Sequence, residues 1–355
     1  MQKDDDEPSK EDEETLRDAE ARRLHALRTE ALSEGPGRDA LYEKHPLVRN
    51  KLRMITPPIK KVYSVVEQVI VHHDPGTCFA GAFRMGKSLG LESVRAECAR
   101  TFPDIPSHIL IAKDHRDPNE AEFYGDLLED YRHGGARIGR AGERKKKMFA
   151  RWEAEARAKA SDRYLLFVDE AENWGEQELI WLRDMTNVME KRNVEIQTLM
   201  FGDTALLLRR AELLEQRRMD LIGRFLLSLH EFHGHQGPED LTETFALLDN
   251  AEKHDFPSGS GIATSQFFLP RAFQNGWRMA GEAPTCWAAF VEVASRKGRT
   301  VKNVGMQWVM RAIRNFLFAH VSKDSVVFIG THEKWLLAVE ASGFENSLDG
   351  DQRDE

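Results

Sequence analysis

Short apolar runs alternate with helical patterns through the middle of the chain. The run Tyr-Leu-Leu-Phe-Val at 164–168 contains no polar residue, which is typical of a central parallel strand covered on both faces. Predicted strands cover 77–80, 108–112, 164–168, 196–201 and 225–232, and predicted helices cover 59–71, 89–99, 121–131, 176–192 and 205–218. Strands that alternate with helices predict a doubly wound α/β fold with a five-stranded parallel sheet.

From residue 238 onward the pattern is almost entirely helical. Helices are predicted at 239–252, 265–279, 284–296, 301–320 and 333–341, with one short strand at 326–329. We therefore divide the chain into a charged N-terminal tail (1–40), an α/β domain (41–237), a mainly helical domain (238–343) and an acidic C-terminal tail (344–355). The N-terminal tail is expected to be disordered or loosely helical because it lacks an apolar period that a core could use.

The composition is that of a soluble globular protein. Of the 355 residues, 41% are hydrophobic and 31% are charged, and no run of eighteen apolar residues occurs. The N-terminus is acidic, unlike a secretory signal, so a cytoplasmic location and no membrane partner are expected. The three cysteines, Cys78, Cys98 and Cys286, lack paired spacing and predict neither disulfides nor a zinc site.

The net charge of −9 is unevenly distributed. Residues 1–20 carry −7 and residues 340–355 carry −5, so the body between them carries +3. The overall acidity therefore comes from the two ends and does not exclude a nucleic-acid partner.

The segment 81–88 fits the phosphate-loop pattern G-x-x-x-x-G-K-[S/T], between a predicted strand and a predicted helix. Its glycines let backbone N–H groups face phosphate oxygens, Lys87 supplies an ammonium to the β and γ phosphates, and the Ser88 hydroxyl ligates Mg²⁺. The predicted nucleotide-binding residues are Gly81, Ala82, Phe83, Arg84, Met85, Gly86, Lys87, Ser88 and Leu89.

Two acids follow the apolar run at 164–168. In the presence of a phosphate loop, Asp169 is placed to hold Mg²⁺ and Glu170 to act as general base on the attacking water. Without the loop, such a pair would more often only end a strand.

Two further residues extend this constellation. Asp203 follows the predicted strand 196–201 and could reach the γ-phosphate or the attacking water, with Thr204 as the alternative. Arg224 precedes the predicted fifth strand and could enter a neighbouring subunit's site as an arginine finger. Arg217 and Arg218 compete for that role, and a surface turn would explain Arg224 equally simply.

A basic stretch at 132–163, with net charge +7, is the local candidate for DNA phosphate contact. Its glycines suggest a flexible loop that leads into a helix. The alternative is a solvated helical face on which acids balance the bases. The DNA candidates are Arg137, Arg140, Arg144, Lys145, Lys146 and Lys147.

Together these features resemble the AAA+ ATPase family over roughly residues 41–320, and within it the transposition regulators of the TnsC, TniB and phage Mu B type. The resemblance implies an AAA+ P-loop fold with a helical lid, ATP and Mg²⁺ as cofactors, and a ring or helical filament on double-stranded DNA. It also implies a transposase and a target selector as partners. The chain departs from the pattern where Asp203 occupies a position that usually holds Thr or Asn. A second sensor arginine has only Arg271 and Arg278 as candidates.

We therefore expect an ATPase that oligomerises on duplex DNA and recruits or activates a transposase at the target site. ATP is favoured over GTP because the sequence lacks the guanine-reading Asn-Lys-x-Asp. One alternative is an AAA+ ATPase that remodels or switches a protein partner without binding DNA. Another is a protein that binds nucleotide without hydrolysing it.

Overall fold

A computed structural model describes residues 10–82 and 84–348, which fall into two compact units. The first, the sheet unit, comprises Ile55–Gln236 and Asn303–Gln307. The second, the helical unit, comprises the described residues of Met1–Met54, Gly237–Lys302 and Trp308–Glu355. In this division residues 41–54 belong to the helical unit and residues 303–307 to the sheet unit.

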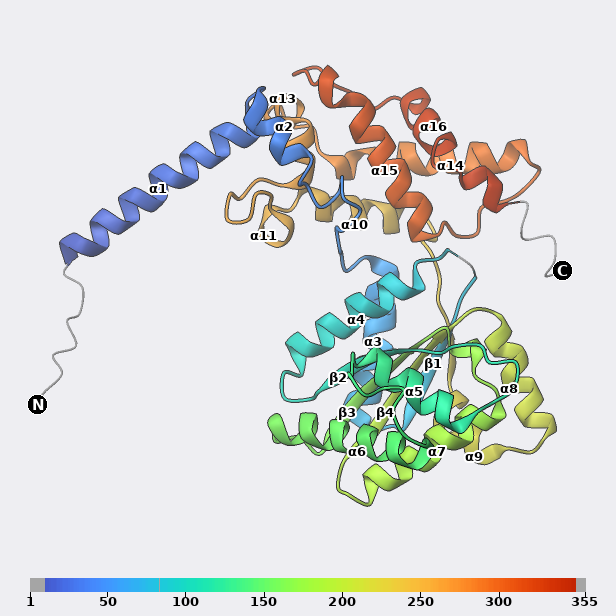
Figure 1. Ribbon diagram of the computed structural model, residues 1–355. Coiled ribbons are helices and arrows are strands. Elements are labelled where there is room, and N and C mark those ends of the chain that lie inside the picture. Colours follow the sequence, from blue (N-terminus) through green and yellow to red (C-terminus); the bar gives the residue numbers. More distant parts are fainter. Residues whose placement is uncertain (1–9, 83, 349–355) are drawn as a thin grey trace, which may run out of the picture. The chain divides into compact units, whose positions relative to one another are not determined.

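The sheet unit contains the five predicted strands, all parallel, in the order β2-β3-β4-β1-β5. Figure 1 labels β1, β2, β3 and β4 of this sheet. The strands are β1 (Gly76–Ala80), β2 (Ser107–Ile111), β3 (Arg163–Asp169), β4 (Glu195–Gly202) and β5 (Leu229–Glu231). The helices are α3 (Pro57–His72), α4 (Lys87–Thr101), α5 (Glu120–Asp130), α6 (Ala141–Ala158), α7 (Glu176–Glu190), α8 (Ala205–Glu215) and α9 (Met219–Leu221).

Helices cover both faces of the sheet, which explains the uninterrupted apolar runs. Along β3, Leu166 and Val168 join one buried layer with residues of α5, α6 and α7. Leu165 and Phe167, which point the other way, join a second layer with residues of α3 and α4. The predicted doubly wound α/β architecture is confirmed.

The fifth strand is shorter than predicted. Residues Ile222–Leu226 form a π-helical turn, labelled η2, and only Leu229–Glu231 pair with β1. Phe225 and Leu226 are apolar because they are buried beneath the sheet, not because they belong to a strand. Arg224 therefore lies in a helical turn and does not open a strand.

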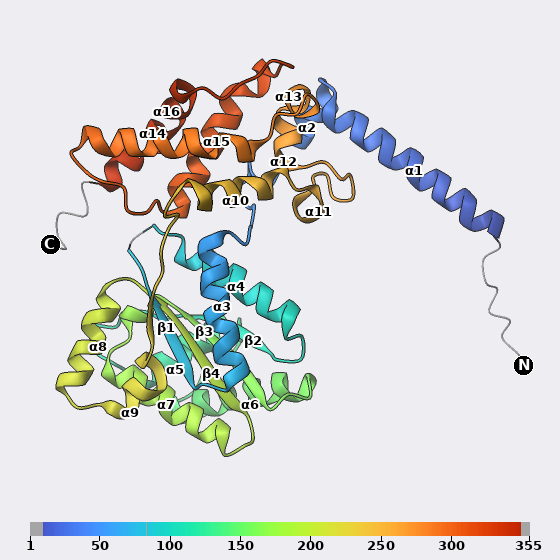
Figure 2. The same ribbon diagram turned by 180° about the vertical axis from the view of Figure 1, so that it is seen from behind.

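The helical unit is built around packed aromatic rings. Phe316 stacks on Trp335 at 3.9 Å between ring centroids, and Phe245 lies on Trp335 at 5.6 Å. Helices α14 and α16 lie side by side (Figure 2). The helices are α1 (Lys10–Leu32), α2 (Pro36–Tyr42), α10 (Pro238–Asp249), α11 (Ala251–His254), α12 (Thr264–Phe268), α13 (Pro270–Gln274), α14 (Ala283–Arg296), α15 (Met306–His320) and α16 (His332–Glu340).

Three details of this unit differ from the sequence-based expectation. Residues Lys10–Leu32 form one continuous helix, whereas residues 1–9 lie outside the described part. Near the end of this helix, the Arg28 side chain donates to the Ser260 carbonyl at 2.5 Å. The predicted helix at 265–279 is divided at Pro270, which cannot continue the hydrogen-bond ladder of α12. Residues 326–329 form no strand, because no neighbouring strand pairs with them in the described chain.

We predict that Phe167→Ala lowers the free energy of unfolding by about 3–5 kcal/mol, because it leaves a cavity in the layer between the sheet and α3 and α4. Urea denaturation followed by circular dichroism measures this loss. Leu208→Ala is the matched control, since Leu208 is 67% exposed and its truncation should change stability by less than about 0.5 kcal/mol. Equal losses for the two variants would contradict the described core.

Candidate active site

Parallel pairing brings three chemically important strand ends to one edge of the sheet. Ala80 at the end of β1 pairs with Gly202 at the end of β4, and Val168 near the end of β3 pairs with Met200 of β4. The phosphate loop after β1, the acid pair at the end of β3 and Asp203 after β4 therefore meet at one place. Strand β4 lies between the other two in the sheet.

The loop and helix α4 have the geometry that the phosphate motif requires. Gly86 adopts φ 97°, a left-handed conformation that favours glycine, immediately before α4 begins at Lys87. The Lys87 ammonium donates to the carbonyls of Gly81 and Ala82 at 2.7 and 3.1 Å, so it is held over the loop. Ser88 lies in the first turn of α4, where backbone N–H groups are unpaired and attract anions.

The remaining predicted loop residues vary in exposure. Arg84 has a left-handed backbone with φ 65° and is exposed, and Leu89 is 41% exposed in the first turn of α4. Met85 is partly buried against the layer that contains α3 and α4. Phe83 lies outside the described residues.

The acid pair ends β3 as predicted. Asp169 is its last residue, and one carboxylate oxygen of Asp169 accepts the backbone N–H of Glu170 at 3.0 Å. Glu170 is exposed and adopts a left-handed backbone with φ 55°, which turns the chain out of the strand. The Asn173 side chain lies 3.4 Å from a Glu170 carboxylate oxygen and can orient it.

Asp203 has a local structural partner. Its Oδ1 accepts the Ala205 N–H at 2.7 Å at the start of α8, which fixes the carboxylate at the strand end. Thr204, the alternative residue, is exposed at the N-cap of α8 and makes no capping bond. The geometry therefore favours Asp203 as the ordered group of the two.

Glu172 is a further residue of the site that the sequence analysis missed. It lies in the short turn Ala171–Asn173 after the acid pair, and its Oε2 is buried without a hydrogen-bond partner. A Cβ added to Gly202 would lie 2.6 Å from that oxygen, so a side chain at the end of β4 would displace the carboxylate from its present position. Burial and the nearby Asp203 raise the pKa of Glu172, while backbone N–H groups and Lys87 act in the opposite direction.

Four carboxylates therefore act on one ammonium. Burial lowers the pKa of Lys87, and the charges of Glu172, Asp203, Asp169 and Glu170 oppose that shift, with Glu172 the strongest of the four. The site carries a formal excess of negative charge, which disfavours a phosphate group unless further positive charge accompanies it.

The residues present fit Mg²⁺ as that positive charge. Mg²⁺ binds through one or two protein oxygens, phosphate oxygens and water, and Ser88 and Asp169 are the protein oxygens at this edge. Among the described residues no cluster of three His, Cys, Asp or Glu side chains is arranged to hold a metal ion on its own. This donor set therefore suits a cation that arrives with phosphates.

A distant segment, Asn303–Gln307, packs directly on the phosphate loop. Val304 and His235 form an antiparallel bridge with two bonds of 2.8 Å, and the N–H of Met306 donates to the Met85 carbonyl at 3.3 Å. A Cβ at Gly305 would lie 2.7 Å from the Arg84 carbonyl, so only glycine permits this approach. Helix α15 thus begins at the phosphate loop, which the sequence did not indicate.

Arg224 lies at the opposite end of the sheet from the loop. Its carbonyl lies close to Gly76 at the start of β1, whereas the phosphate loop follows the end of β1. Its guanidinium donates to the Thr186 hydroxyl at 2.6 Å and lies 3.6 Å from Glu190. It cannot reach its own phosphate loop from there.

Of the competing arginines, Arg218 is committed to an ion-pair network. It is paired with Glu176 and with Asp220, and Asp220 also pairs with Arg183. Hydrogen bonds from Arg218 lower the pKa of Asp220, so the carboxylate stays charged. Arg218 is therefore less available to a neighbouring subunit than Arg224.

The basic stretch is partly used to hold its own fold. Arg137 pairs with Asp126 at 2.5 Å and with Glu129 at 2.6 Å, and Arg144 and Lys147 donate to backbone carbonyls of residues 121–138. Arg140 and Lys146 are exposed, and Lys145 lies 5.5 Å from the Tyr124 ring centroid. The stretch consists of a segment held by these hydrogen bonds, followed by helix α6.

Arg271 and Arg278 both have partners inside the helical unit. Arg271 pairs with Glu34 at 3.0 Å, and Arg278 stacks on Phe273 at 3.7 Å and donates to the Trp277 carbonyl. Neither contact distinguishes one of them as a second sensor.

The comparisons with known proteins agree with this fold. Residues 71–209, less than half of the chain, match the family model "AAA domain". The chain has the AAA+ P-loop NTPase fold, with its five-stranded parallel sheet, flanking helices and a helical C-terminal portion. None of the curated proteins matches the chain.

Several solved structures are similar in outline. Domain III of the Thermotoga maritima replication initiation protein DnaA is 12% identical with a TM-score of 0.44, over 80% of this chain and 92% of that one. The Aeropyrum pernix ORC2 protein is 10% identical with a TM-score of 0.40, over 84% and 95%. Drosophila ORC bound to AT-rich DNA and Cdc6 is 9% identical with a TM-score of 0.39, over 91% and 45%. At these levels the similarities carry no inference about activity.

Over the part of the chain that the structure describes, no helix combines the length and apolar character needed to cross a membrane.

We predict that Glu172→Gln tightens Mg²⁺–ATP binding by about three- to tenfold, because it removes a negative charge from a partly buried site that must accept phosphates. Titration with a fluorescent ATP analogue measures the dissociation constant. Glu97→Gln, which changes a partly buried carboxylate paired with Arg100 on α4, should leave binding unchanged. Weaker binding by Glu172→Gln would show that this carboxylate supports the nucleotide instead of opposing it.

Proposed function

We propose that this chain is an ATP-dependent, DNA-binding AAA+ regulator that oligomerises on duplex DNA and recruits or activates a transposase at the target site. The observation that carries the proposal is the shared sheet edge of the phosphate loop, Asp169 and Glu170. The AAA domain match over residues 71–209 supports nucleotide hydrolysis as the underlying activity.

In the proposed reaction each group of the chain has one task. Loop N–H groups and Lys87 bind the phosphates, Ser88 and Asp169 hold the metal, and Glu170 accepts a proton from the attacking water. Bound Mg²⁺ would neutralise phosphate charge in a site that is otherwise too negative. Asp203, fixed by its bond with Ala205 N–H, is positioned to orient the water.

Oligomerisation is supported by the location of Arg224. This arginine lies at the end of the sheet away from its own loop, and its side chain is only 26% exposed beside Thr186 and Glu190. In a ring or filament it would complete the site of the next subunit and stabilise charge in the transition state. Each ATP site would then be shared between two copies of the chain.

Duplex DNA as a partner rests on the basic stretch. Among the described residues, no carboxylate forms an ion pair with Arg140, Lys145 or Lys146, so these three are the members of the stretch best suited to phosphate contact. Transposase and target-selector partners rest on the resemblance to the TnsC, TniB and Mu B type regulators.

A second candidate function is an AAA+ switch that acts on a protein partner without binding DNA. The internal bonds of Arg137, Arg144 and Lys147 favour it, because they consume half of the predicted DNA-binding charges. A gel-shift assay at low salt with a non-hydrolysable ATP analogue separates the two, and absence of DNA binding there favours the second.

We predict contrasting effects for two variants of the site. Lys87→Ala should abolish nucleotide binding and, with it, ordered oligomers on DNA, because the ammonium that engages the β and γ phosphates is lost. Glu170→Gln should retain ATP, slow its hydrolysis by about 100-fold or more and stabilise the oligomers, because the general base is lost.

ATPase assays with and without duplex DNA, together with negative-stain microscopy, measure both effects. Turnover that survives Glu170→Gln unchanged would indicate another base or no hydrolytic role for this edge. Oligomers that survive Lys87→Ala would separate assembly from nucleotide binding.

We predict that the double variant Lys145→Glu and Lys146→Glu weakens DNA binding by about tenfold at low salt and reduces its salt dependence, since two phosphate contacts are lost. Fluorescence anisotropy with labelled duplex DNA measures both quantities. Arg137→Gln is the contrasting variant, and it should lower the melting temperature with little effect on DNA affinity. A larger effect of Arg137→Gln on affinity would reverse the assignment.

A further inference from the structure

Four aliphatic side chains are exposed together on the helical unit, in the loop before α16 and on that helix. Val326, Val327 and Ile329 are 58%, 78% and 67% exposed, and Leu337 is 61% exposed. We call these four residues the aliphatic patch. Isolated exposed apolar residues are ordinary on a protein surface, but a group of this kind marks an interaction site.

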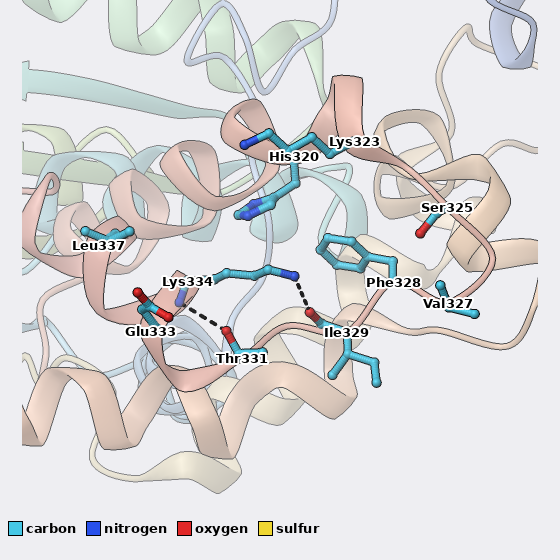
Figure 3. A pocket seen from close by; sticks show the side chains of 10 residues that line it. All are labelled: His320, Lys323, Ser325, Val327, Phe328, Ile329, Thr331, Glu333, Lys334 and Leu337. Carbon is cyan, nitrogen blue, oxygen red and sulfur yellow. Dashed lines mark hydrogen bonds between the residues drawn. The ribbon is translucent and has the colours of Figure 1, made fainter.

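A cavity of about 470 Å³ lies within the patch (Figure 3). Val327, Ile329 and Leu337 line it together with Phe328, whose ring is buried. The volume falls within the range of small ligand pockets and would accommodate an aliphatic side chain with part of its backbone.

The rim of this cavity is positively charged. Lys323 and Lys334 line it, and Glu333 is the one carboxylate among its lining residues. The Lys334 ammonium is fixed, since it donates to the Ile329 carbonyl at 2.6 Å and lies 4.5 Å from the Phe328 ring centroid. The N-terminus of α16 begins at the same place, where Thr331 caps the helix, and its dipole adds to the attraction for an anion.

The loop is also open to backbone pairing. Within the described part of the chain, the N–H and carbonyl of Val327 and the N–H of Ile329 have no hydrogen-bond partner. The sequence Val-Val-Phe-Ile has high strand propensity, which is why it predicts a strand, but the structure supplies no strand beside it. Residues 325–328 form a turn that the Phe328 N–H closes on the Ser325 carbonyl at 3.1 Å, so the open groups can form single hydrogen bonds with a bound peptide without forming a strand edge.

The loop is held rigidly enough to act as a template. Phe328 is its buried anchor, the Asn275 side chain donates to the Val326 carbonyl at 2.7 Å, and the Gly330 N–H donates to Glu282 at 3.1 Å. Glu282 is itself fixed by the indole N–H groups of Trp277 and Trp335. A partner would meet a preformed surface and pay little ordering entropy.

We propose that the aliphatic patch binds an extended, acidic segment of a partner protein. The segment would cross residues 326–329, form hydrogen bonds with open backbone groups of Val327 and Ile329, and insert an aliphatic side chain into the cavity. A neighbouring carboxylate would meet Lys323 and Lys334. This proposal does not depend on nucleotide or DNA binding.

A labelled peptide of about eight residues that alternates valine with glutamate is the probe, and the same peptide with lysine in place of glutamate is its control. We expect the acidic peptide to bind the full chain with a dissociation constant of about 10–100 µM, without ATP or DNA. Fluorescence anisotropy measures this affinity. Failure of the acidic peptide to bind, or equal binding of both peptides, would overturn the proposal.

Variants test whether the peptide binds at the patch. Val327→Ser and Ile329→Ser together, and Lys323→Glu alone, should each weaken binding by about tenfold or more while leaving the melting temperature unchanged, because all three side chains face solvent. Ile138→Ser, which alters an aliphatic residue 68% exposed on the sheet unit, is the matched control and should bind as the unmodified chain does. Unchanged binding by the patch variants would overturn the proposal.

Two other possible occupants of the aliphatic patch are a second copy of the chain and the chain's own C-terminal residues, and each would give a different experimental result. If a second copy of the chain covers the patch, sedimentation should show a concentration-dependent dimer that Val327→Ser abolishes. If the acidic residues at 349–355 cover it, their deletion should raise peptide affinity severalfold. A dimer of this kind would overturn the proposal, because the patch would then serve self-association. Higher peptide affinity after the deletion would also overturn it, because residues 349–355 and not a partner protein would be the occupant of the patch.

Discussion

The pairing of β1 with β4 is the constraint on which the candidate site depends. Hydrogen bonding between the two strands extends one residue past the end of β1, where the Gly81 N–H donates to the Gly202 carbonyl at 3.1 Å. The phosphate loop therefore leaves the sheet directly beside the end of β4. Because β4 also pairs with β3, the same register fixes Asp169 on the other side. A register slip in β4 by one residue would turn its buried side chains to the opposite layer, so the core and the site are specified by the same contacts.

Electrostatics then determine what this edge of the sheet can bind. Lys87 is the ammonium of the site, and the carboxylates around it outnumber it. Glu172 contributes most of the four to that field. It is half-buried, and its buried Oε2 has no hydrogen-bond partner, a costly arrangement for which Gly202 leaves room. A site of this charge disfavours a bare phosphate relative to a phosphate accompanied by a divalent cation.

The sequence predicted the elements whose signals are local, and it missed those that depend on tertiary contacts. The strands were recognisable because burial on both faces removes every polar residue from a run such as 164–168. Glu172 was not recognisable, because its burial depends on a turn after β3 and on a glycine thirty residues later in β4. Phe225 and Val327 show the same limit, since an apolar, β-prone residue predicts burial or pairing but does not specify which partner is present. The basic stretch was identified by charge, but only the structure shows that Arg137 is committed to Asp126 and Glu129.

The segment Asn303–Gln307 contacts the phosphate loop directly, so a movement of the loop would affect this segment. Gly305 is packed so closely on Arg84 that a single added carbon would clash, and Met306 holds the Met85 carbonyl through its backbone N–H. Because close packing leaves no compressible space, a shift of the loop around phosphates must either carry this segment with it or break the Met306 bond. Met306 is the first residue of α15, so either outcome alters the start of that helix. The segment contacts the phosphate loop through backbone atoms, so replacing one side chain of the segment by another would leave the contact largely intact. A side chain at Gly305 would disrupt it, because the added carbon would clash with the Arg84 carbonyl.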